Sequence, residues 1–192
     1  MSAHRPKLII GLGNFGQQYE QTRHNVGFMA LDHLAEEYGT IWQEKTKFKA
    51  SVAEVRLGAQ RVIFAKPTTF YNLSGEAAVA IMQFFKLEPD DVLVVHDELA
   101  LPFGTIRTRL SGSDAGNNGI KSLNAHIGQT YARIRVGIAN DQLRPSNAAD
   151  FVLGKFTADE LASMPQIAEH IARFVEDFIH EDKEFAHTSV HL

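Results

Sequence analysis

Hydrophobic and polar residues alternate along the chain with two periods, one typical of strands and one typical of helices. Short apolar runs bounded by turn residues predict strands buried in a sheet. Two of these runs flank Gly58 and predict a β-hairpin. The predicted strands begin with the apolar run at Leu8 and continue with residues 48–57, 61–65, 91–95, 105–110 and 133–138.

Apolar residues spaced three and four positions apart predict helices between and after these strands. One helix is expected to begin near His24 and another at Ser74, whose hydroxyl would cap it. A third should follow a glycine-rich loop, with Asn118 near its cap. The capping box that starts at Thr157 predicts one long amphipathic helix reaching Phe178.

The remaining segments are expected to be irregular, with a mobile loop over residues 140–149 and a frayed tail over residues 184–192. Strands that alternate with helices, plus one hairpin, belong to the α/β class. We therefore expect a single domain over residues 1–192, folded as an α/β/α sandwich around a mixed, mainly parallel sheet.

The composition agrees with a single globular domain and excludes several classes of function. A chain of 192 residues that is 44% apolar can bury one core. It has no cysteine, which excludes disulfides, thiolate metal sites and a thiol nucleophile. The first residues lack the apolar core of a signal peptide, and no run approaches the ~18 apolar residues of a membrane span. A cytoplasmic protein without membrane contact is expected.

The net charge of −4 does not favour a polyanion partner, but the charges are unevenly distributed. Between Glu98 and Lys155 there are seven Lys or Arg residues and four Asp or Glu residues, whereas the chain after Lys155 is strongly acidic. This distribution is compatible with a local basic face and equally with ordinary solvated surface.

Five polar residues stand where predicted strands end or helices begin: Asn14, His24, Asn72, Asp97 and Asn118. Such junctions meet at one edge of an open α/β sheet, so they predict one cleft. An imidazole can take a proton from water, and a carboxylate on its other nitrogen fixes its tautomer. Amide side chains can hold a carbonyl and stabilise an oxyanion. The sequence therefore predicts attack of a His24-activated water on an acyl carbonyl, with Asp97 orienting His24.

Two of these motifs also resemble other kinds of site, a dinucleotide-binding loop and a metal site. Gly11-x-Gly13-x-x-Gly16 is a dinucleotide-binding pattern, but no helix opens inside the glycine run and no second strand carries the expected acid. His96, Asp97 and Glu98 are possible metal ligands, but successive strand residues point to opposite faces and converge poorly on one ion. We therefore expect neither a cofactor nor a metal.

Separated motifs carry a resemblance to a known family. GLGN at 11–14, Tyr19 and TRHNVG at 22–27 form the first signature, and KPTTFYNLSG at 66–75 the second. The glycine-rich loop that leads to Asn118 and FVLGKF at 151–156 follow. Together they resemble the bacterial-type peptidyl-tRNA hydrolases. The resemblance implies a monomer that cleaves the ester between peptide and tRNA in peptidyl-tRNA released prematurely from ribosomes.

The resemblance also implies roles for individual residues. His24 would be the catalytic base, Asp97 its support, and Asn14 would help to discriminate blocked from free aminoacyl groups. Contacts to the tRNA-borne substrate would come from Tyr19, Phe70, Asn72 and Asn118, and contacts to the acceptor phosphates from Arg107 and Arg109.

Three positions depart from the family pattern. Phe15 stands where the signature GLGNPG has Pro, Tyr71 replaces the more usual Met, and Asn117 stands where GGHNG has His. Roles that depend on the replaced side chains do not transfer to this chain. A non-catalytic RNA-binding module on the same fold is the alternative, although binding alone has no need for an oriented base.

Overall fold

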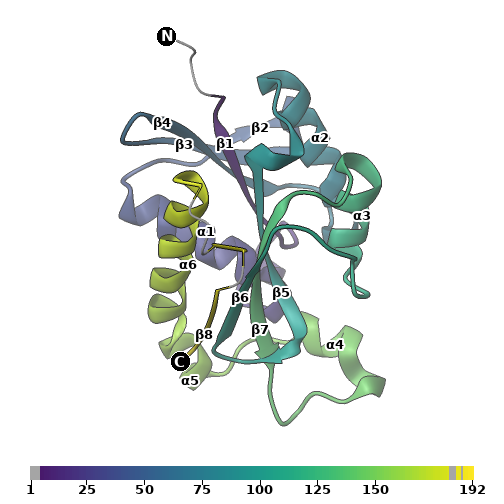
Figure 1. The fold of residues 1–192 in the computed structure, drawn as a ribbon. Helices are drawn as coiled ribbons and strands as arrows, with labels where there is room; N and C mark the ends of the chain where they lie inside the picture. Colours follow the sequence, from purple (N-terminus) through teal and green to yellow (C-terminus); the bar gives the residue numbers. More distant parts are fainter. Residues whose placement is uncertain (1–4, 182–184, 187) are drawn as a thin grey trace.

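The computed structural model describes residues 5–181, 185–186 and 188–192. Within them, eight strands form one sheet with helices on both faces (Figure 1). The strands are β1 Lys7–Gly11, β2 Gln43–Lys45, β3 Ala50–Leu57, β4 Gln60–Pro67, β5 Val92–Pro102, β6 Thr105–Arg109, β7 Ala132–Ala139 and β8 Ser189–His191. The helices are α1 Val26–Glu37, α2 Ser74–Phe85, α3 Asn118–Ile127, α4 Ala148–Leu153, α5 Ala158–Ala162 and α6 Met164–Ile179.

The order of strands across the sheet is β2-β3-β4-β1-β5-β7-β6-β8. β1 pairs in parallel with β4 and β5, and β5 pairs in parallel with β7. The outer pairs are antiparallel. The predicted mixed sheet is confirmed, but it is not mainly parallel: of the seven strand pairs among the described residues, three are parallel, and these are confined to the four central strands.

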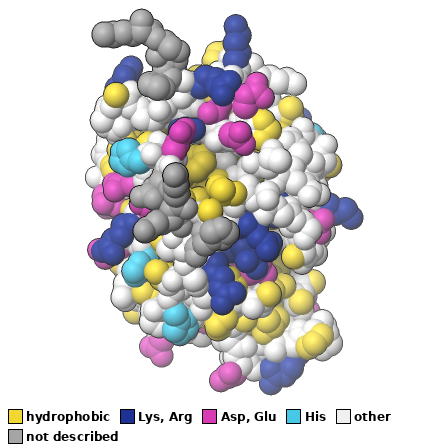
Figure 2. Space-filling model, viewed as in Figure 1, with side chains coloured by type: hydrophobic (Ala, Val, Ile, Leu, Met, Phe, Trp, Pro, Cys, Tyr) yellow, Lys and Arg dark blue, Asp and Glu magenta, His cyan; other side chains and the backbone are white. Residues whose placement is uncertain are grey.

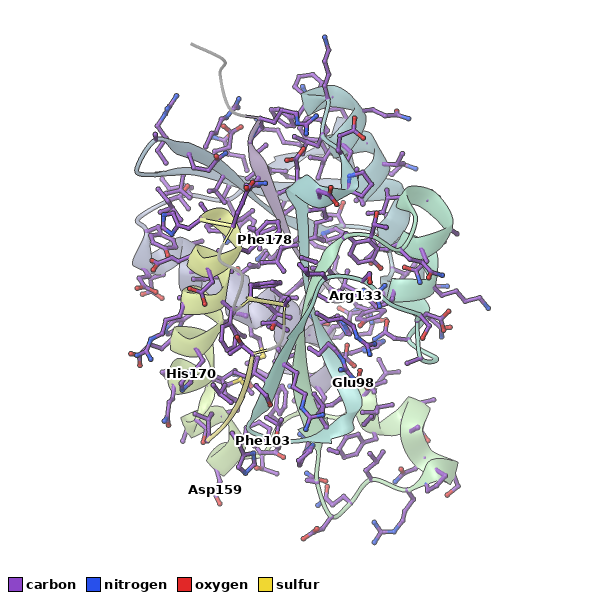
Figure 3. The ribbon with its side chains drawn as sticks, in the orientation of Figure 1. Glu98, Phe103, Arg133, Asp159, His170 and Phe178 are labelled. Atoms are coloured by element: carbon purple, nitrogen blue, oxygen red, sulfur yellow. The ribbon has the colours of Figure 1, made fainter. Side chains whose placement is uncertain are left out.

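Each face of the sheet has its own hydrophobic core, as expected for an α/β/α sandwich. Ile9 and Val95 point towards the core shared with α1 and α6. Leu8 and Val94 point the other way, into the core shared with α2 and α3. Figure 3 shows the same division, with Phe178 on the α6 side of the sheet and Arg133 on the α3 side. The near-continuous apolar runs of β1 and β5 are explained by burial on both faces.

The start of α1 is pressed against the carboxyl ends of β1 and β5, and this contact requires glycine. A Cβ atom placed on Gly27 would lie 2.4 Å from the carbonyl oxygen of Val95 and 2.6 Å from the amide nitrogen of Leu12. A Cβ atom on Gly11 would lie 2.5 Å from the carbonyl oxygen of Gly27. The two glycines therefore set how closely the helix and the residues just before it approach the strand ends.

Several predictions about the elements were wrong. The segment after Thr157 forms two helices, α5 and α6, because Ser163 ends one and Pro165 lies in the first turn of the next. The tail is not frayed where it is described: β8 pairs with β6, and Phe185 is buried. Residues 184 and 187 of the predicted tail lie outside the described residues.

One helix start differs from prediction and another agrees with it. The hydroxyl of Ser74 does not cap α2 but donates to the carbonyl oxygen of Tyr71, 2.7 Å away. Asn118 lies near the cap of α3 as predicted, since it is the first residue of the helix, and the side chain of Asn117 caps it by accepting a hydrogen bond from the amide of Ile120. The predicted loop over 140–149 is shorter than expected because α4 begins at Ala148.

No helix in the described part of the chain is both long enough and apolar enough to cross a membrane.

Replacing Gly27 with alanine tests the close approach of α1. Alanine gains up to about 1 kcal/mol of helix propensity, but its methyl group would overlap backbone atoms that cannot rotate away. We expect Gly27→Ala to lower the free energy of unfolding by about 1–3 kcal/mol in urea denaturation. Gln83→Ala, on the exposed face of α2, is the control and should change stability by less than about 0.5 kcal/mol. A Gly27→Ala variant as stable as the control would contradict this account.

Candidate active site

His24 and Asp97 meet at the carboxyl edge of the sheet. His24 lies in a 3₁₀ turn over Arg23–Asn25 that leads into α1, and Asp97 lies on β5 beyond the end of its pairing with β1. The Nδ1 atom of His24 is 2.9 Å from the Oδ2 atom of Asp97. The side chain of Asp97 is 3% exposed and that of His24 is 16% exposed. The carboxylate is thus shielded from water, while the imidazole reaches the solvent.

This contact determines the tautomer of His24. A carboxylate accepts hydrogen bonds, so Nδ1 must carry the proton. The Nε2 atom then keeps its lone pair, and it has no hydrogen-bond partner among the residues that the structure describes. His24 also lines a cavity of about 500 Å³. The arrangement therefore presents a base to the cavity.

Tyr71 covers one face of the imidazole. The two rings are stacked, with centroids 3.5 Å apart and planes inclined by 10°. The tyrosine hydroxyl donates a hydrogen bond to the Oδ1 atom of Asp97. Burial and the charge of Asp97 raise the pKa of Tyr71 well above its ordinary value, so the hydroxyl stays protonated.

Asn14 is held by backbone and side-chain contacts on both sides. Its amide N–H donates to Oδ1 of Asn25 at 2.8 Å, and Nδ2 of Asn25 donates to its carbonyl oxygen at 2.9 Å. Its own Oδ1 accepts the amide N–H of Tyr71 at 2.8 Å. Because that oxygen is occupied, the Nδ2 group is the part of Asn14 that can donate to a ligand in the cavity.

The cavity brings together six of the nine predicted site residues. Phe70, Asn72 and Asn118 are exposed at its rim, where Phe70 is 61% exposed. The predicted residues that line it are Asn14, His24, Phe70, Asn72, Asp97 and Asn118.

Tyr19, Arg107 and Arg109 do not line this cavity. Tyr19 is half-buried in a short 3₁₀ turn, and its carbonyl oxygen accepts the hydroxyl of Thr22 at 2.7 Å. Arg107 and Arg109 project from one face of β6, as their spacing predicted, and both are exposed. These three residues therefore lie outside the cavity that His24 lines.

The neighbours of Asp97 on β5 have other partners. The Nδ1 atom of His96 donates to the carbonyl oxygen of Asp97 at 2.8 Å, and burial lowers the pKa of His96, which keeps this ring neutral. Glu98 accepts a hydrogen bond from Nε of Arg135 at 3.1 Å. The side chains of these three residues therefore each have a different hydrogen-bond partner.

A buried arginine fixes the glycine-rich loop at the cavity. The guanidinium of Arg133 donates to the carbonyl oxygens of Gly112 and Ser113, the latter at 2.7 Å. Arg133 comes from β7 and lies on the α3 side of the sheet (Figure 3). The loop then turns into α3, where Asn117 and Asn118 face the cavity.

A second buried arginine supports His24 from behind. Arg23 is 2% exposed, and its guanidinium lies 4.6 Å and 5.0 Å from the ring centroids of Phe151 and Phe156. It forms an ion pair of 2.7 Å with Glu160, whose other oxygen accepts from Asn140. The backbone of Arg23 also donates to Gly154. The turn that carries His24 is thereby fixed to the segment after α4.

Sequence reasoning missed several residues of the site. Tyr71 and Asn117 were recognised only as departures from a pattern, and their mutual contact has no signature in the sequence. The outer wall of the cavity comes from Ala148, Ala149, Val152 and Leu153 of α4. Asn25 follows His24 directly at the predicted helix start, but its hydrogen bonds to the backbone of Asn14 have no signature in the sequence.

A shielded carboxylate, an imidazole and amide side chains meet at the carboxyl edge of a mixed sheet, which is the edge where open α/β enzymes hold their ligands. The comparisons with known proteins specify the family. The family model described as "Peptidyl-tRNA hydrolase" matches residues 8–191. The chain belongs to the peptidyl-tRNA hydrolase family, so its assignment to the hydrolases from the motifs is confirmed.

Individual relatives agree along nearly the whole chain. The peptidyl-tRNA hydrolase of Gloeobacter violaceus is 46% identical over 171 residues, which cover 88% of this chain and 86% of the relative. That of Thermosynechococcus vestitus is 44% identical over 190 residues, covering 96% and 93%. The crystal structure of the enzyme from Acinetobacter baumannii superimposes with a TM-score of 0.86 at 31% identity, covering 94% of this chain and 92% of the other.

Replacing Glu160 with glutamine tests the support behind His24. Burial raises the pKa of Glu160, but hydrogen bonds from Arg23, Thr157 and Asn140 outweigh it and leave the pKa below its ordinary value. The carboxylate therefore stabilises the fold fully above its unfolded-state pKa, and this contribution is lost as the pH falls through the lowered pKa. Glu160→Gln should cost about 3 kcal/mol at pH 7 because it leaves Arg23 buried without its anion.

The difference from wild type should shrink as the pH falls below about 4, measured by urea unfolding at several pH values. Glu169→Gln is the matched control, since Glu169 pairs with Arg173 on the exposed face of α6. It should change stability by less than about 1 kcal/mol. A cost at Glu160 that is constant from neutral to acidic pH would contradict this account.

Proposed function

We propose that this protein hydrolyses the ester bond between peptide and tRNA in peptidyl-tRNA, using a water molecule that His24 activates. The 2.9 Å contact between Nδ1 of His24 and the buried carboxylate of Asp97 carries the proposal, because it leaves Nε2 as a base facing the cavity. The names of the relatives supply the substrate class.

In the reaction, water attacks the carbonyl carbon of the peptidyl ester while Nε2 of His24 takes one of its protons. Asp97 stabilises the imidazolium that forms. The tetrahedral intermediate then collapses, the bond to the ribose oxygen breaks, and the proton on Nε2 passes to that oxygen. The products are a free peptide acid and a tRNA with its hydroxyl restored. These steps need no metal ion.

The amides around the cavity supply the donors that the reaction requires. The Nδ2 group of Asn14 is placed to donate to the carbonyl oxygen of the N-acyl group, which a free aminoacyl group lacks, and this contact would distinguish blocked from free aminoacyl groups. Asn72 and Asn118 at the rim can hold the peptide backbone or the ribose. Phe70 offers an exposed ring on which the terminal adenine can stack, and Tyr19 would contact the substrate farther out.

The tRNA acceptor stem is proposed to lie along β6 and β7. Arg107 and Arg109 are paired across the sheet with Arg135 and Arg133. Figure 2 shows Lys and Arg side chains gathered near the middle of the face that β6 crosses. These four arginines form a basic ladder across the two strands, and Glu98 neutralises part of its charge through Arg135. Phosphate contacts here would position the tRNA without reading its sequence.

We also infer that the protein works as a monomer in the cytoplasm. The cavity is built from one chain, and one copy carries both the base and the basic ladder. Light scattering after size-exclusion chromatography measures the mass directly.

Removal of the base tests the proposed reaction. His24→Ala should fold normally and lower kcat for an N-acylated aminoacyl-tRNA by a factor of about 10²–10⁴. Asp97→Asn, which keeps the shape but removes the charge, should also lower kcat strongly. Binding of tRNA by His24→Ala should be unchanged. Wild-type protein that binds tRNA but releases no peptide would instead support the RNA-binding module, and full activity without His24 would exclude the mechanism.

Neutralising the ladder tests tRNA docking. Arg107→Gln and Arg109→Gln should each raise KM, leave kcat nearly unchanged and reduce the slope of log affinity against log salt by about one. Arg173→Gln, on exposed α6, is the control and should leave both KM and the slope unchanged. A salt slope identical in all three variants would place the acceptor stem elsewhere.

A further inference from the structure

A chain of hydrogen bonds joins four side chains at the site, those of Asn117, Tyr71, Asp97 and His24. The family signature does not describe this chain. The Oδ1 atom of Asn117 accepts the amide N–H of Ile120 at 3.0 Å, which fixes its Nδ2 group towards the hydroxyl of Tyr71 at 2.9 Å. An amide nitrogen can only donate, so the tyrosine proton cannot point back to Asn117. That proton must point to Oδ1 of Asp97. The other oxygen of Asp97 accepts from His24.

We propose that Tyr71 is a positioning residue for the base: its hydroxyl holds Asp97 and its ring holds His24, while Asn117 orients the hydroxyl. This inference rests on the proposed function. Tyr71 contacts His24 and Asp97 directly and is only 3% exposed, so it acts through these two side chains and not on the substrate.

The two contacts of Tyr71 have different consequences. Stacking limits rotation of the imidazole and keeps Nε2 directed at the cavity. Donation to Asp97 draws on the negative charge of the carboxylate and so weakens its hold on the proton at Nδ1. The hydroxyl of Tyr71 and the Nδ1–H group of His24 therefore share the charge of the same carboxylate.

Few other charges compete with this effect. Among the described residues, the titratable side chains that line the cavity are those of His24, Tyr71, Asp97 and Glu98. Glu98 is bound to Arg135. The α4 wall and the start of α3 contribute only uncharged side chains to the cavity. Behind Asp97, His96 contacts its carbonyl oxygen and Arg133 lies near His96. The groups behind Asp97 are unchanged when the Tyr71 hydroxyl is removed.

The test is the pH dependence of kcat/KM for an N-acylated aminoacyl-tRNA in Tyr71→Phe, which keeps the stacked ring and removes only the hydroxyl. The acid limb, which reports protonation of His24, should move to higher pH by about half a unit to one unit. At pH 7 kcat should fall by about three- to tenfold with KM unchanged. An acid limb at the wild-type position overturns the proposal, whatever the change in kcat.

Asn117→Ser provides a second route if Tyr71→Phe does not fold. Serine retains the cap of α3 but cannot reach the tyrosine hydroxyl. The acid limb should move in the same direction by a smaller amount, and the double variant should shift no further than Tyr71→Phe alone. Additive shifts would show that the two residues act separately and would overturn the chain of contacts.

A direct measurement separates this proposal from the proposed function. In the free protein, ¹⁵N NMR of the His24 ring should show the proton on Nδ1 and a titration midpoint that rises in Tyr71→Phe. This readout needs no substrate. If wild-type protein does not cleave peptidyl-tRNA, the proposed function fails, but the ring titration still tests Tyr71. If the titration midpoint of the His24 ring is the same in Tyr71→Phe and in wild type, only the role of Tyr71 is overturned.

Discussion

The hydrogen bond between His24 and Asp97 joins two segments that lie 73 residues apart in the chain, and most of the structure around the site serves to hold it. Asp97 is carried on β5, the central strand next to β1. His24 reaches it only because the following helix can touch the ends of both strands. Gly11 and Gly27 allow that approach, since a side chain at either position would overlap backbone atoms. Two residues without a functional side chain therefore allow the distance between His24 and Asp97.

Around this bond the polar groups are arranged with little freedom. The backbone N–H and carbonyl groups of Asn14 both bond to the side chain of Asn25, and the side-chain oxygen of Asn14 accepts from the backbone of Tyr71. Both groups of the Asn25 amide are therefore occupied by the protein, and the Nδ2 group of Asn14 is left for the cavity. Such pre-organisation lets a site stabilise a developing charge without rearranging during the reaction.

Much of this arrangement could be predicted from the sequence. Asn14, His24 and Asp97 follow strands or precede a helix, and the carboxyl ends of parallel strands meet at one edge, so their proximity follows from topology. The contact of Tyr71 could not be predicted, because a buried tyrosine in sequence is indistinguishable from a core aromatic. The α4 wall is one short helix with too few residues to show a period.

The errors in the predicted elements have physical causes as well. β8 has only three residues, too few to show an alternating pattern, and the strand exists because the open edge of β6 pairs with it. Periodicity continues across Ser163, so the break between α5 and α6 is hidden from a search for apolar spacing. Pro165, near the start of α6, was the available signal.

The contacts of Arg23 connect the turn that carries His24 to α4, which forms the outer wall of the cavity. Its guanidinium lies over rings on either side of Gly154, and its backbone bonds to that glycine. Phe151 belongs to α4, whose other side chains line the cavity. The position of α4 and the orientation of the His24 ring are therefore coupled through Arg23. Because Phe151 of α4 packs on Arg23, which shares its 3₁₀ turn with His24, a displacement of α4 would be transmitted to the imidazole through packing alone.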